Sequence, residues 1–325
     1  MAQIMTIQLC NLVTKTVVFG LLLGTLSSCQ EPTSTANKAR VDERDGNITP
    51  ISSVLDMFSC KPAHVAFVAA HRGTVEASAF PENALQSLQA LHANGVPFAE
   101  IDVARLKDGT QILFHDGVWD KRSTGTGPIV ASDWDASQKL LLKDTNGQLT
   151  SIRPSRFEDV LAWAKNRMYL EIDFKSSADP AQIISAIRAA NMINQVILIS
   201  YNTDQAVSLH KLAPKAALSV GISKIGDVKA LEARGIPTEV MTAWTGGGPL
   251  EKSLAKSLRA KNIPILAASF FDLDEQLQKS GDFEQYVEFA RLPDLVVSDQ
   301  AYAAQGMLSI KGEDLMVMEA CLRSR

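Results

Sequence analysis

The sequence predicts a (β/α)₈ barrel, and three observations carry this expectation. Short apolar segments typical of buried strands alternate with helical patterns from residue 64 onward. One strand segment follows its predecessor after a tight turn, which leaves eight others for a parallel barrel. No glycine-rich phosphate loop follows the first strand, and this argues against the alternative of an open doubly wound sheet.

The expected strands are apolar runs bounded by turn residues. Lys107-Asp108-Gly109 separates the second run from the third. A parallel neighbour needs a crossover of about a dozen residues or more, so this short link predicts an antiparallel hairpin flap. The expected strands cover residues 64–70, 97–103, 111–115, 168–174, 195–201, 216–222, 239–244, 264–270 and 294–298.

Helical patterns fill most of the intervals between these strands. Gly95 follows the last turn of the first helix, and Asp179-Pro180 provides a cap followed by proline at the first helical position. The expected helices cover residues 82–93, 157–164, 180–190, 203–212, 228–234 and 250–261.

Composition limits the partners of this chain. Its 325 residues are 46% apolar, enough for one large core, which we place at residues 61–310 with a C-terminal tail at 311–325. The net charge is −4 and there is no basic run, which excludes nucleic acid as a partner because binding it requires concentrated positive charge. A small anionic substrate would instead be held by a few cations and a metal. The oligomeric state stays open.

The N-terminus has the layout of a bacterial export signal. Lys15 precedes an apolar stretch, residues 17–26, that is too short to span a bilayer. The stretch ends in Leu26-Ser27-Ser28-Cys29, which resembles the lipobox of bacterial lipoproteins, where Cys29 becomes the acylated first residue. The alternative is a secretory signal with an incidental cysteine.

We therefore expect a signal peptide over residues 1–28, a lipid anchor on Cys29 and a flexible polar tether over residues 29–60. The expected location is the bacterial cell envelope. The residue after Cys29 is Gln30 and not aspartate. By the same resemblance, this suggests sorting to the outer membrane, with the protein facing the periplasm.

Two cysteines, Cys60 and Cys321, flank the predicted barrel. In an oxidising compartment they can form a disulfide that ties the two ends of the barrel together. The sequence leaves two separate thiols open as the alternative, because it does not show that the two Cα atoms approach each other.

Charged and imidazole side chains gather where the predicted strands end. The carboxyl ends of barrel strands share one mouth, and alternate residues of a strand share one face. The flap carries a histidine back toward that mouth. The candidate site residues are His71, Arg72, Glu100, Asp102, His115, Glu171, Asp173 and Lys175.

The inward carboxylates predict a metal centre. Buried unpaired carboxylates are costly, so Glu100 and Asp102 must meet cations or a metal. Salt bridges to Arg72 or Lys175 are the structural alternative. Carboxylates from two strands form a hard, all-oxygen environment that suits Mg²⁺ or Ca²⁺.

Two histidines at the same mouth indicate proton transfer. One of His71 and His115 can act as base and the other as acid around a phosphorus atom, although the sequence does not say which. Arg72 offers a bidentate fork to phosphate oxygens and Lys175 a point charge. Cleavage of a phosphodiester is the chemistry that this set predicts.

These motifs resemble the glycerophosphodiester phosphodiesterase family. The resemblance implies a TIM barrel, a divalent metal, and hydrolysis of glycerophosphodiesters to glycerol 3-phosphate and an alcohol. It assigns the metal to Glu100, Asp102 and Asp173, acid and base roles to His71 and His115, and phosphate contacts to Arg72 and Lys175. It rests on His71-Arg72-Gly73, Pro81-Glu82-Asn83, Glu100-Ile101-Asp102-Val103, Lys107-Asp108-Gly109, His115-Asp116, Arg122-Ser123-Thr124-Gly125-Thr126-Gly127 and Asp173-Phe174-Lys175.

Two departures from the family pattern concern the metal and the substrate. Asp173 stands where the family usually carries Glu, and Glu171 on the same face is a further possible ligand. Residues 268–272 replace the usual Trp-Thr-x-Asn segment, and Phe270-Phe271 within them favours a lipid-directed alternative, a lysophospholipase D or sphingomyelinase D-like enzyme. A non-catalytic barrel lipoprotein is the remaining alternative.

Overall fold

The computed structural model of this protein describes residues 51–76, 79–281 and 283–325. The expected signal peptide (residues 1–28), the lipidation at Cys29 and the tether up to residue 50 lie outside the described residues. Among the residues that are described, no helix has both the length and the apolar character needed to cross a membrane.

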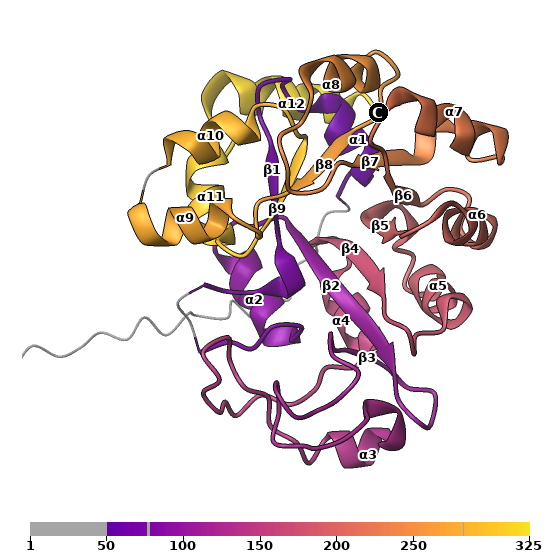
Figure 1. The fold of residues 1–325 in the computed structure, drawn as a ribbon, viewed down its shortest axis with the longest axis vertical. Coiled ribbons are helices and arrows are strands. Elements are labelled where there is room, and N and C mark those ends of the chain that lie inside the picture. The colour runs from indigo at the N-terminus through magenta and orange to yellow at the C-terminus, as the bar shows by residue number, and fades with distance from the viewer. Residues whose placement is uncertain (1–50, 77–78, 282) are drawn as a thin grey trace, which may run out of the picture. The chain divides into compact units, whose positions relative to one another are not determined.

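Eight parallel strands form a closed barrel, as predicted (Figure 1). The ring closes because β1 pairs with both β2 and β9. A ninth strand, β3, pairs antiparallel with β2 and forms the predicted flap. The strands are β1 (Phe67–Ala70), β2 (Phe98–Arg105), β3 (Gln111–Leu113), β4 (Tyr169–Phe174), β5 (Val196–Ile199), β6 (Ala217–Gly221), β7 (Met241–Trp244), β8 (Ile265–Ala268) and β9 (Leu295–Ser298).

Helices surround this barrel and begin where the sequence provides caps. The Asp179 side chain accepts hydrogen bonds from the backbone of Ala181 and Gln182, with Pro180 at the first turn. The helices are α1 (Val54–Cys60), α2 (Leu85–Ala93), α3 (Trp134–Ser137), α4 (Phe157–Ala164), α5 (Pro180–Ala189), α6 (Thr203–Leu212), α7 (Ile225–Ala233), α8 (Lys252–Arg259), α9 (Leu273–Ser280), α10 (Glu284–Ala290), α11 (Ala301–Leu308) and α12 (Gly312–Arg323), with 3₁₀ turns η1 (His71–Gly73), η2 (Ile129–Ala131), η3 (Ile193–Gln195) and η4 (Thr238–Val240).

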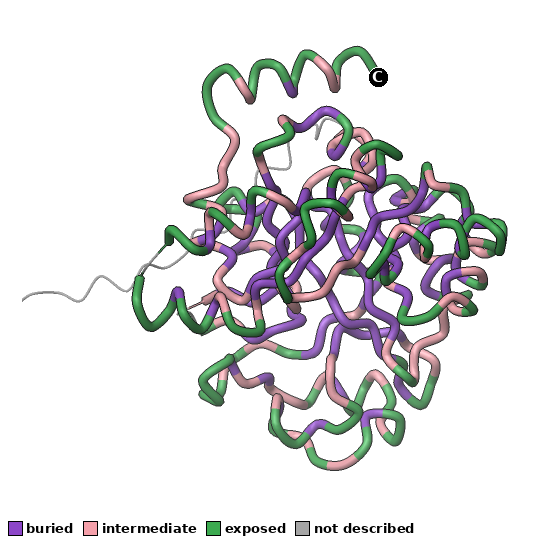
Figure 2. The backbone as a smooth tube through the Cα atoms, turned by 45° about the horizontal axis from the view of Figure 1, so that its top comes forward, coloured by how far each residue is buried: buried purple, intermediate pink, exposed green. Residues whose placement is uncertain are grey.

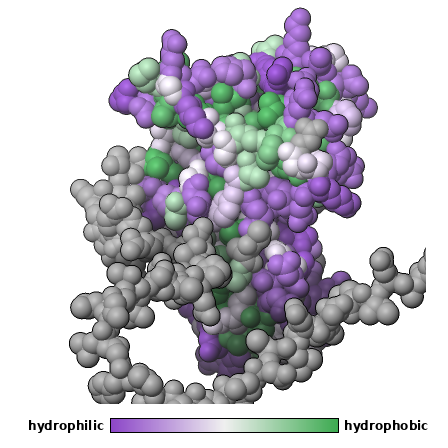
Figure 3. Space-filling model, turned by 90° about the vertical axis from the view of Figure 1, so that its left-hand side faces the viewer, coloured by the Kyte–Doolittle hydropathy of each residue, from purple (hydrophilic) through white to green (hydrophobic). Residues whose placement is uncertain are grey.

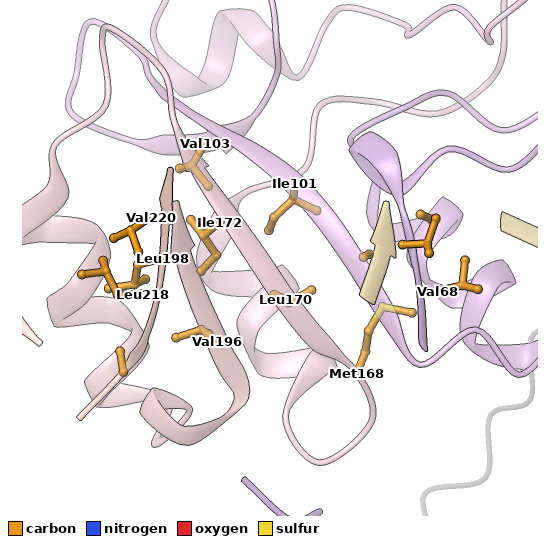
Figure 4. Packing of buried hydrophobic residues seen from close by; sticks show 14 of the residues in the cluster. Val68, Ile101, Val103, Met168, Leu170, Ile172, Val196, Leu198, Leu218 and Val220 are labelled. Carbon is orange, nitrogen blue, oxygen red and sulfur yellow. The ribbon is translucent and has the colours of Figure 1, made fainter. Parts of the chain in front are cut away.

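Strand alternation separates the packing face from the site. Ile101 and Ile172 are fully buried among apolar residues that include those of the surrounding helices (Figure 4). The acidic residues that flank these isoleucines in the sequence face the barrel interior instead. They are Glu100 and Asp102 on β2, and Glu171 and Asp173 on β4. Full burial of such an apolar side chain stabilises the fold by roughly 1.5–3 kcal/mol. Buried segments gather in the middle of the tube in Figure 2, and exposed segments lie around them. Hydrophilic residues surround small apolar patches on the face drawn in Figure 3.

The structure places the start of the folded domain earlier than predicted. Residues 54–60 form α1 rather than the end of the tether predicted over residues 29–60. Val54 and Phe58 are one helical turn apart and pack with Phe67 and Phe98 inside the lower barrel. This apolar face makes α1 part of the folded domain.

A disulfide joins Cys60 of α1 to Cys321 of α12, with 5.6 Å between the two Cα atoms. The residues assigned to a C-terminal tail, 311–325, therefore contain a helix that is covalently tied to the barrel floor. The bond closes a loop with a sequence separation of 261 residues, and such cross-links restrict the unfolded chain.

Removal of this disulfide is expected to destabilise the protein without changing its chemistry. The double variant Cys60→Ala/Cys321→Ala should lose roughly 2–4 kcal/mol of unfolding free energy, measured by urea denaturation. Reductant should destabilise the wild type and have no effect on the variant. Equal denaturation midpoints for oxidised wild type and variant would contradict the expectation.

Candidate active site

The predicted site residues lie around one cavity at the carboxyl ends of β1, β2 and β4. This cavity has a volume of about 360 Å³, and a polar cleft of about 870 Å³, lined in part by Arg72, adjoins it at His71 and Phe270. The cavity lining includes His71, Glu100, Asp102, His115, Glu171, Asp173 and Lys175.

Three buried carboxylates form a group that could hold a metal ion. Glu100, Asp102 and Asp173 each offer an oxygen atom, and these oxygens lie within 4.8 Å of one another. The register explains the grouping, since Asp102 of β2 is paired with Asp173 of β4. Burial, followed by the charge of Asp102, raises the pKa of Glu100 well above its usual range. A cation would relieve both effects.

The donor set fits a hard divalent cation. Oδ1 of Asp173 is buried and has no hydrogen-bond partner among the described residues, so one ligand position is left open. All candidate ligands are carboxylate oxygens, which suit Mg²⁺ or Ca²⁺. Glu171, the further possible ligand, lies deeper on β4 and outside the group. Burial raises its pKa to about 8.

Lys175 bridges two members of the acidic group. Its Nζ atom lies 2.9 Å from Oδ1 of Asp102 and 3.0 Å from Oδ2 of Asp173. Burial disfavours the charged lysine, but attraction to Asp102 and Asp173 outweighs it and raises the pKa of Lys175. The salt bridge considered as the alternative to a metal is thus present, and it leaves Asp173 Oδ1 unsatisfied.

In the turn after β1, the backbone of Arg72 contacts the carboxylate group and its side chain contacts His115. Arg72 takes a left-handed conformation, with φ of 54°, and its backbone N–H donates to Oε2 of Glu100 at 2.7 Å. Gly73 also has a positive φ, 59°, and a Cβ there would lie 2.7 Å from a methyl carbon of Leu88. Glycine is therefore required at this position. Strained backbone of this kind is typical of functional sites.

Asn83 is a site residue whose role the sequence did not reveal. Its side-chain amide donates to Oδ2 of Asp102 at 2.7 Å, and its carbonyl oxygen accepts from the Asp102 backbone at 2.9 Å. Asn83 adopts a φ of 54°, so the helix predicted from Glu82 begins instead at Leu85. The available signal was its place in the Pro81-Glu82-Asn83 motif.

Each candidate histidine has a carboxylate on Nδ1. His71 Nδ1 donates to Asp299 Oδ1 at 2.9 Å, and the ring stacks on Phe270 with centroids 3.9 Å apart. His115 Nδ1 donates to Asp116 at 2.8 Å. Neither Asp116 nor Asp299 is among the site residues predicted from the sequence, although Asp116 belongs to the His115-Asp116 motif.

His115 Nε2 accepts a hydrogen bond from Arg72 Nη2 at 2.9 Å. A guanidinium can only donate, so this nitrogen carries a lone pair and no proton. The two histidines therefore differ in their surroundings, because the described contacts of His71 include no such cation.

A long excursion of the chain after the flap, residues 117–155, reaches the site through an ion pair and through Thr145 and Asn146, which line the polar cleft. Arg122 lies 3.3 Å from Glu82, whose other oxygen lies 3.4 Å from Arg72. Within the excursion, Trp119 is buried and packs on Phe114, with ring centroids 4.7 Å apart.

Aromatic side chains form the other side of the cavity: Tyr201, Trp244, Phe270 and Phe271. Tyr201 and Phe271 are 70% and 57% exposed, which places apolar surface at the mouth. The Tyr201 hydroxyl donates to Asp173 Oδ2 at 2.6 Å. Burial and this contact raise the pKa of Tyr201.

Comparison with known proteins places this chain in a family. The model described as the glycerophosphoryl diester phosphodiesterase family matches residues 71–263, more than half of the chain. The match contains the carboxylate group, both histidines and Lys175.

The chain is also similar to individual sequences. It is 27% identical to an uncharacterised protein of Bacillus subtilis over 163 residues, covering 48% of this chain and 66% of that protein. It is 30% identical to human glycerophosphodiester phosphodiesterase 1 over 91 residues, covering 28% of this chain and 27% of that enzyme. The matched part is thus less than two thirds of either relative.

Solved structures share the fold. A glycerophosphoryl diester phosphodiesterase from Parabacteroides distasonis superposes with a TM-score of 0.70 at 19% identity, over 82% of this chain and 96% of that one. A phosphodiesterase from Oleispira antarctica, in complex with the product sn-glycerol-3-phosphate, gives a TM-score of 0.59 at 20% identity, over 78% and 99%.

Proposed function

Because this chain belongs to the glycerophosphoryl diester phosphodiesterase family, we propose that it hydrolyses glycerophosphodiesters to glycerol 3-phosphate and an alcohol in a metal-dependent reaction. The observation that carries the proposal is the cavity in which a buried carboxylate group, Glu100, Asp102 and Asp173, lies with two histidines. These three residues would hold Mg²⁺ or Ca²⁺, which supplies charge to neutralise the phosphodiester.

Arg72 and Lys175 bind the anionic phosphate in this proposal. Arg72 contributes a planar fork of donors and lines the polar cleft beside His71. Lys175 lines the cavity between Asp102 and Asp173 and adds a point charge. When Arg72 turns from His115 to a phosphate oxygen, the lone pair on His115 Nε2 becomes available.

We assign His115 as the base and His71 as the acid. His115 Nε2 takes a proton from the nucleophile, either water or the neighbouring hydroxyl of the glycerol moiety, and Asp116 holds the ring through Nδ1. The nucleophile forms a bond to phosphorus while the bond to the leaving alcohol breaks. His71, oriented by Asp299 and Phe270, gives a proton to the departing oxygen. With water as the nucleophile this step gives glycerol 3-phosphate directly. With the glycerol hydroxyl as the nucleophile it gives a cyclic phosphate, whose P–O bond a water molecule then breaks with the two histidines in exchanged roles.

One specific observation favours a second candidate, the lysophospholipase D or sphingomyelinase D-like activity. The exposed rings of Tyr201 and Phe271 place apolar surface beside the reacting centre, where a lipid chain would lie. Glycerol alone does not need such a surface.

A side-by-side assay distinguishes these functions. Purified protein is incubated with Mg²⁺ or Ca²⁺ and with glycerophosphocholine, glycerophosphoethanolamine or lysophosphatidylcholine. The proposed function predicts metal-dependent release of glycerol 3-phosphate from the first two. A higher kcat/KM on lysophosphatidylcholine would favour the lipid-directed candidate, and no turnover on any substrate would favour the non-catalytic alternative.

A further inference from the structure

The hydroxyl of Tyr201 makes a contact that the proposed chemistry does not use. It donates to Oδ2 of the metal-ligand candidate Asp173. We propose that Tyr201 is a positioning residue for the metal site, whose hydroxyl holds Asp173 so that its other oxygen binds the divalent cation. This inference rests on the proposed metal-dependent function and deepens it.

The two carboxylate oxygens of Asp173 differ in their hydrogen bonds. Oδ2 receives the Tyr201 hydroxyl at 2.6 Å and the Lys175 ammonium at 3.0 Å. Oδ1 is buried and receives no hydrogen bond from the described residues. Hydrogen bonds to an ionised acceptor are short and strong, so two donors on one oxygen fix the orientation of the carboxylate. The oxygen left for a cation is Oδ1.

Tyr201 is an unusual residue to make this contact, because it is 70% exposed. Such a side chain can satisfy its hydroxyl with water, yet this one turns inward. Its backbone is anchored on both sides. Tyr201 N–H donates to Gln205 Oε1 at 2.9 Å, and Ser200 donates to the Ser219 carbonyl through both its backbone and its hydroxyl. The backbone that carries the ring is thus fixed by hydrogen bonds, which limits the positions that the hydroxyl can reach.

Lys175 alone would hold Asp173 less well. Its ammonium is shared with Asp102 and, in the proposed function, with the phosphate of the substrate. The Tyr201 hydroxyl, by contrast, is a neutral donor whose only hydrogen-bond partner among the described residues is Asp173. Asp173 also has a shorter side chain than Glu100, so its contribution to a shared ion depends more strongly on how the carboxylate is turned. Groups that orient a metal ligand in this way contribute measurably to metal affinity.

The variant Tyr201→Phe tests the inference because it removes the hydroxyl and keeps the ring. Mg²⁺ and Ca²⁺ are titrated into the full chain by calorimetry. We expect an affinity roughly 10–100-fold weaker than that of the wild type, and a kcat close to the wild-type value once metal is saturating. The increase in thermal unfolding midpoint on adding metal should shrink in parallel.

Tyr302→Phe is the matched control. Tyr302 is a half-buried tyrosine whose hydroxyl accepts a long hydrogen bond, 3.4 Å, from Asn94. Losing that hydroxyl should leave metal affinity unchanged. Tyr201→Leu should weaken metal binding to the same extent as Tyr201→Phe, since both lack the hydroxyl.

Two outcomes would overturn the inference. One is a dissociation constant of Tyr201→Phe within about twofold of the wild type, against the expected loss. The other is weakening by Tyr201→Leu alone, which would assign the effect to the ring. A wild-type protein that binds neither ion would instead remove the proposed metal-dependent function itself, and with it this role for Tyr201.

Discussion

Replacing His115 with alanine is expected to lower kcat on glycerophosphodiesters by roughly 10²–10⁴-fold, the usual contribution of a general acid or base. His71→Ala should have an effect of similar size. Metal affinity should stay close to the wild-type value in both variants, because neither side chain belongs to the carboxylate group. The double variant should cost little more than the worse single one if the two act as a unit.

Substrates with different leaving groups distinguish the acid role of His71 from the base role of His115. A p-nitrophenolate departs without a proton, so His71→Ala should recover much of its activity on bis(p-nitrophenyl) phosphate relative to an alkyl diester. His115→Ala should lose activity on both, because the nucleophile needs a base in each case. The reverse pattern would show that the acid and base assignments are exchanged. Near-normal turnover of His115→Ala on alkyl diesters would show that the flap carries no catalytic group.

The second large effect is expected from Glu100→Gln, which keeps the side-chain shape and removes the charge. Loss of a group that only orients a ligand typically weakens metal binding by roughly 10–100-fold, so loss of a ligand should reach about 100-fold or more. Excess metal should restore part of the activity. Calorimetric titration of the ion measures the first effect, and activity against metal concentration measures the second.

Glu171→Gln is the matched control for this variant. Glu171 is paired with Glu100 across β2 and β4 and is equally hidden from solvent, but it lies outside the carboxylate group. Its replacement should leave metal affinity unchanged. An equal loss in both variants would make Glu171 a ligand as well.

The barrel could be predicted from the sequence because its strands are short, apolar and separated by helical patterns. The flap followed from Lys107-Asp108-Gly109, since so short a link cannot join parallel neighbours. Helix α1 was not predicted. Val54 and Phe58 stabilise this short helix by packing against the barrel floor, and that contact is not visible in the local sequence. Tertiary packing decided that element, not local propensity.

The carboxylates, histidines and Lys175 could be placed together from strand periodicity, the common mouth of a barrel and the hairpin flap. Their partners could not. Asn83, Asp299 and Tyr201 reach the site from loops, and loop conformation has no period in the sequence. Asn83 even lies in a segment that favours helix, and its left-handed φ is stabilised by Asp102, a contact between distant parts of the chain.

The excursion over residues 117–155 has a consequence for how such a protein can diversify. Its two ends lie beside the flap, because it begins directly after His115-Asp116 and because Arg156, which follows it, bridges to Ile112. Trp119, Ile129 and Leu142 of the excursion form a small apolar cluster together with Ile112 and Phe114 of the flap. Between those ends, lineages can lengthen, shorten or replace loops without disturbing the strands that hold the carboxylates. Thr145 and Asn146 line the polar cleft, so under the proposed function exchanges at these two positions can change which alcohol is accepted while the carboxylates on the strands stay in place.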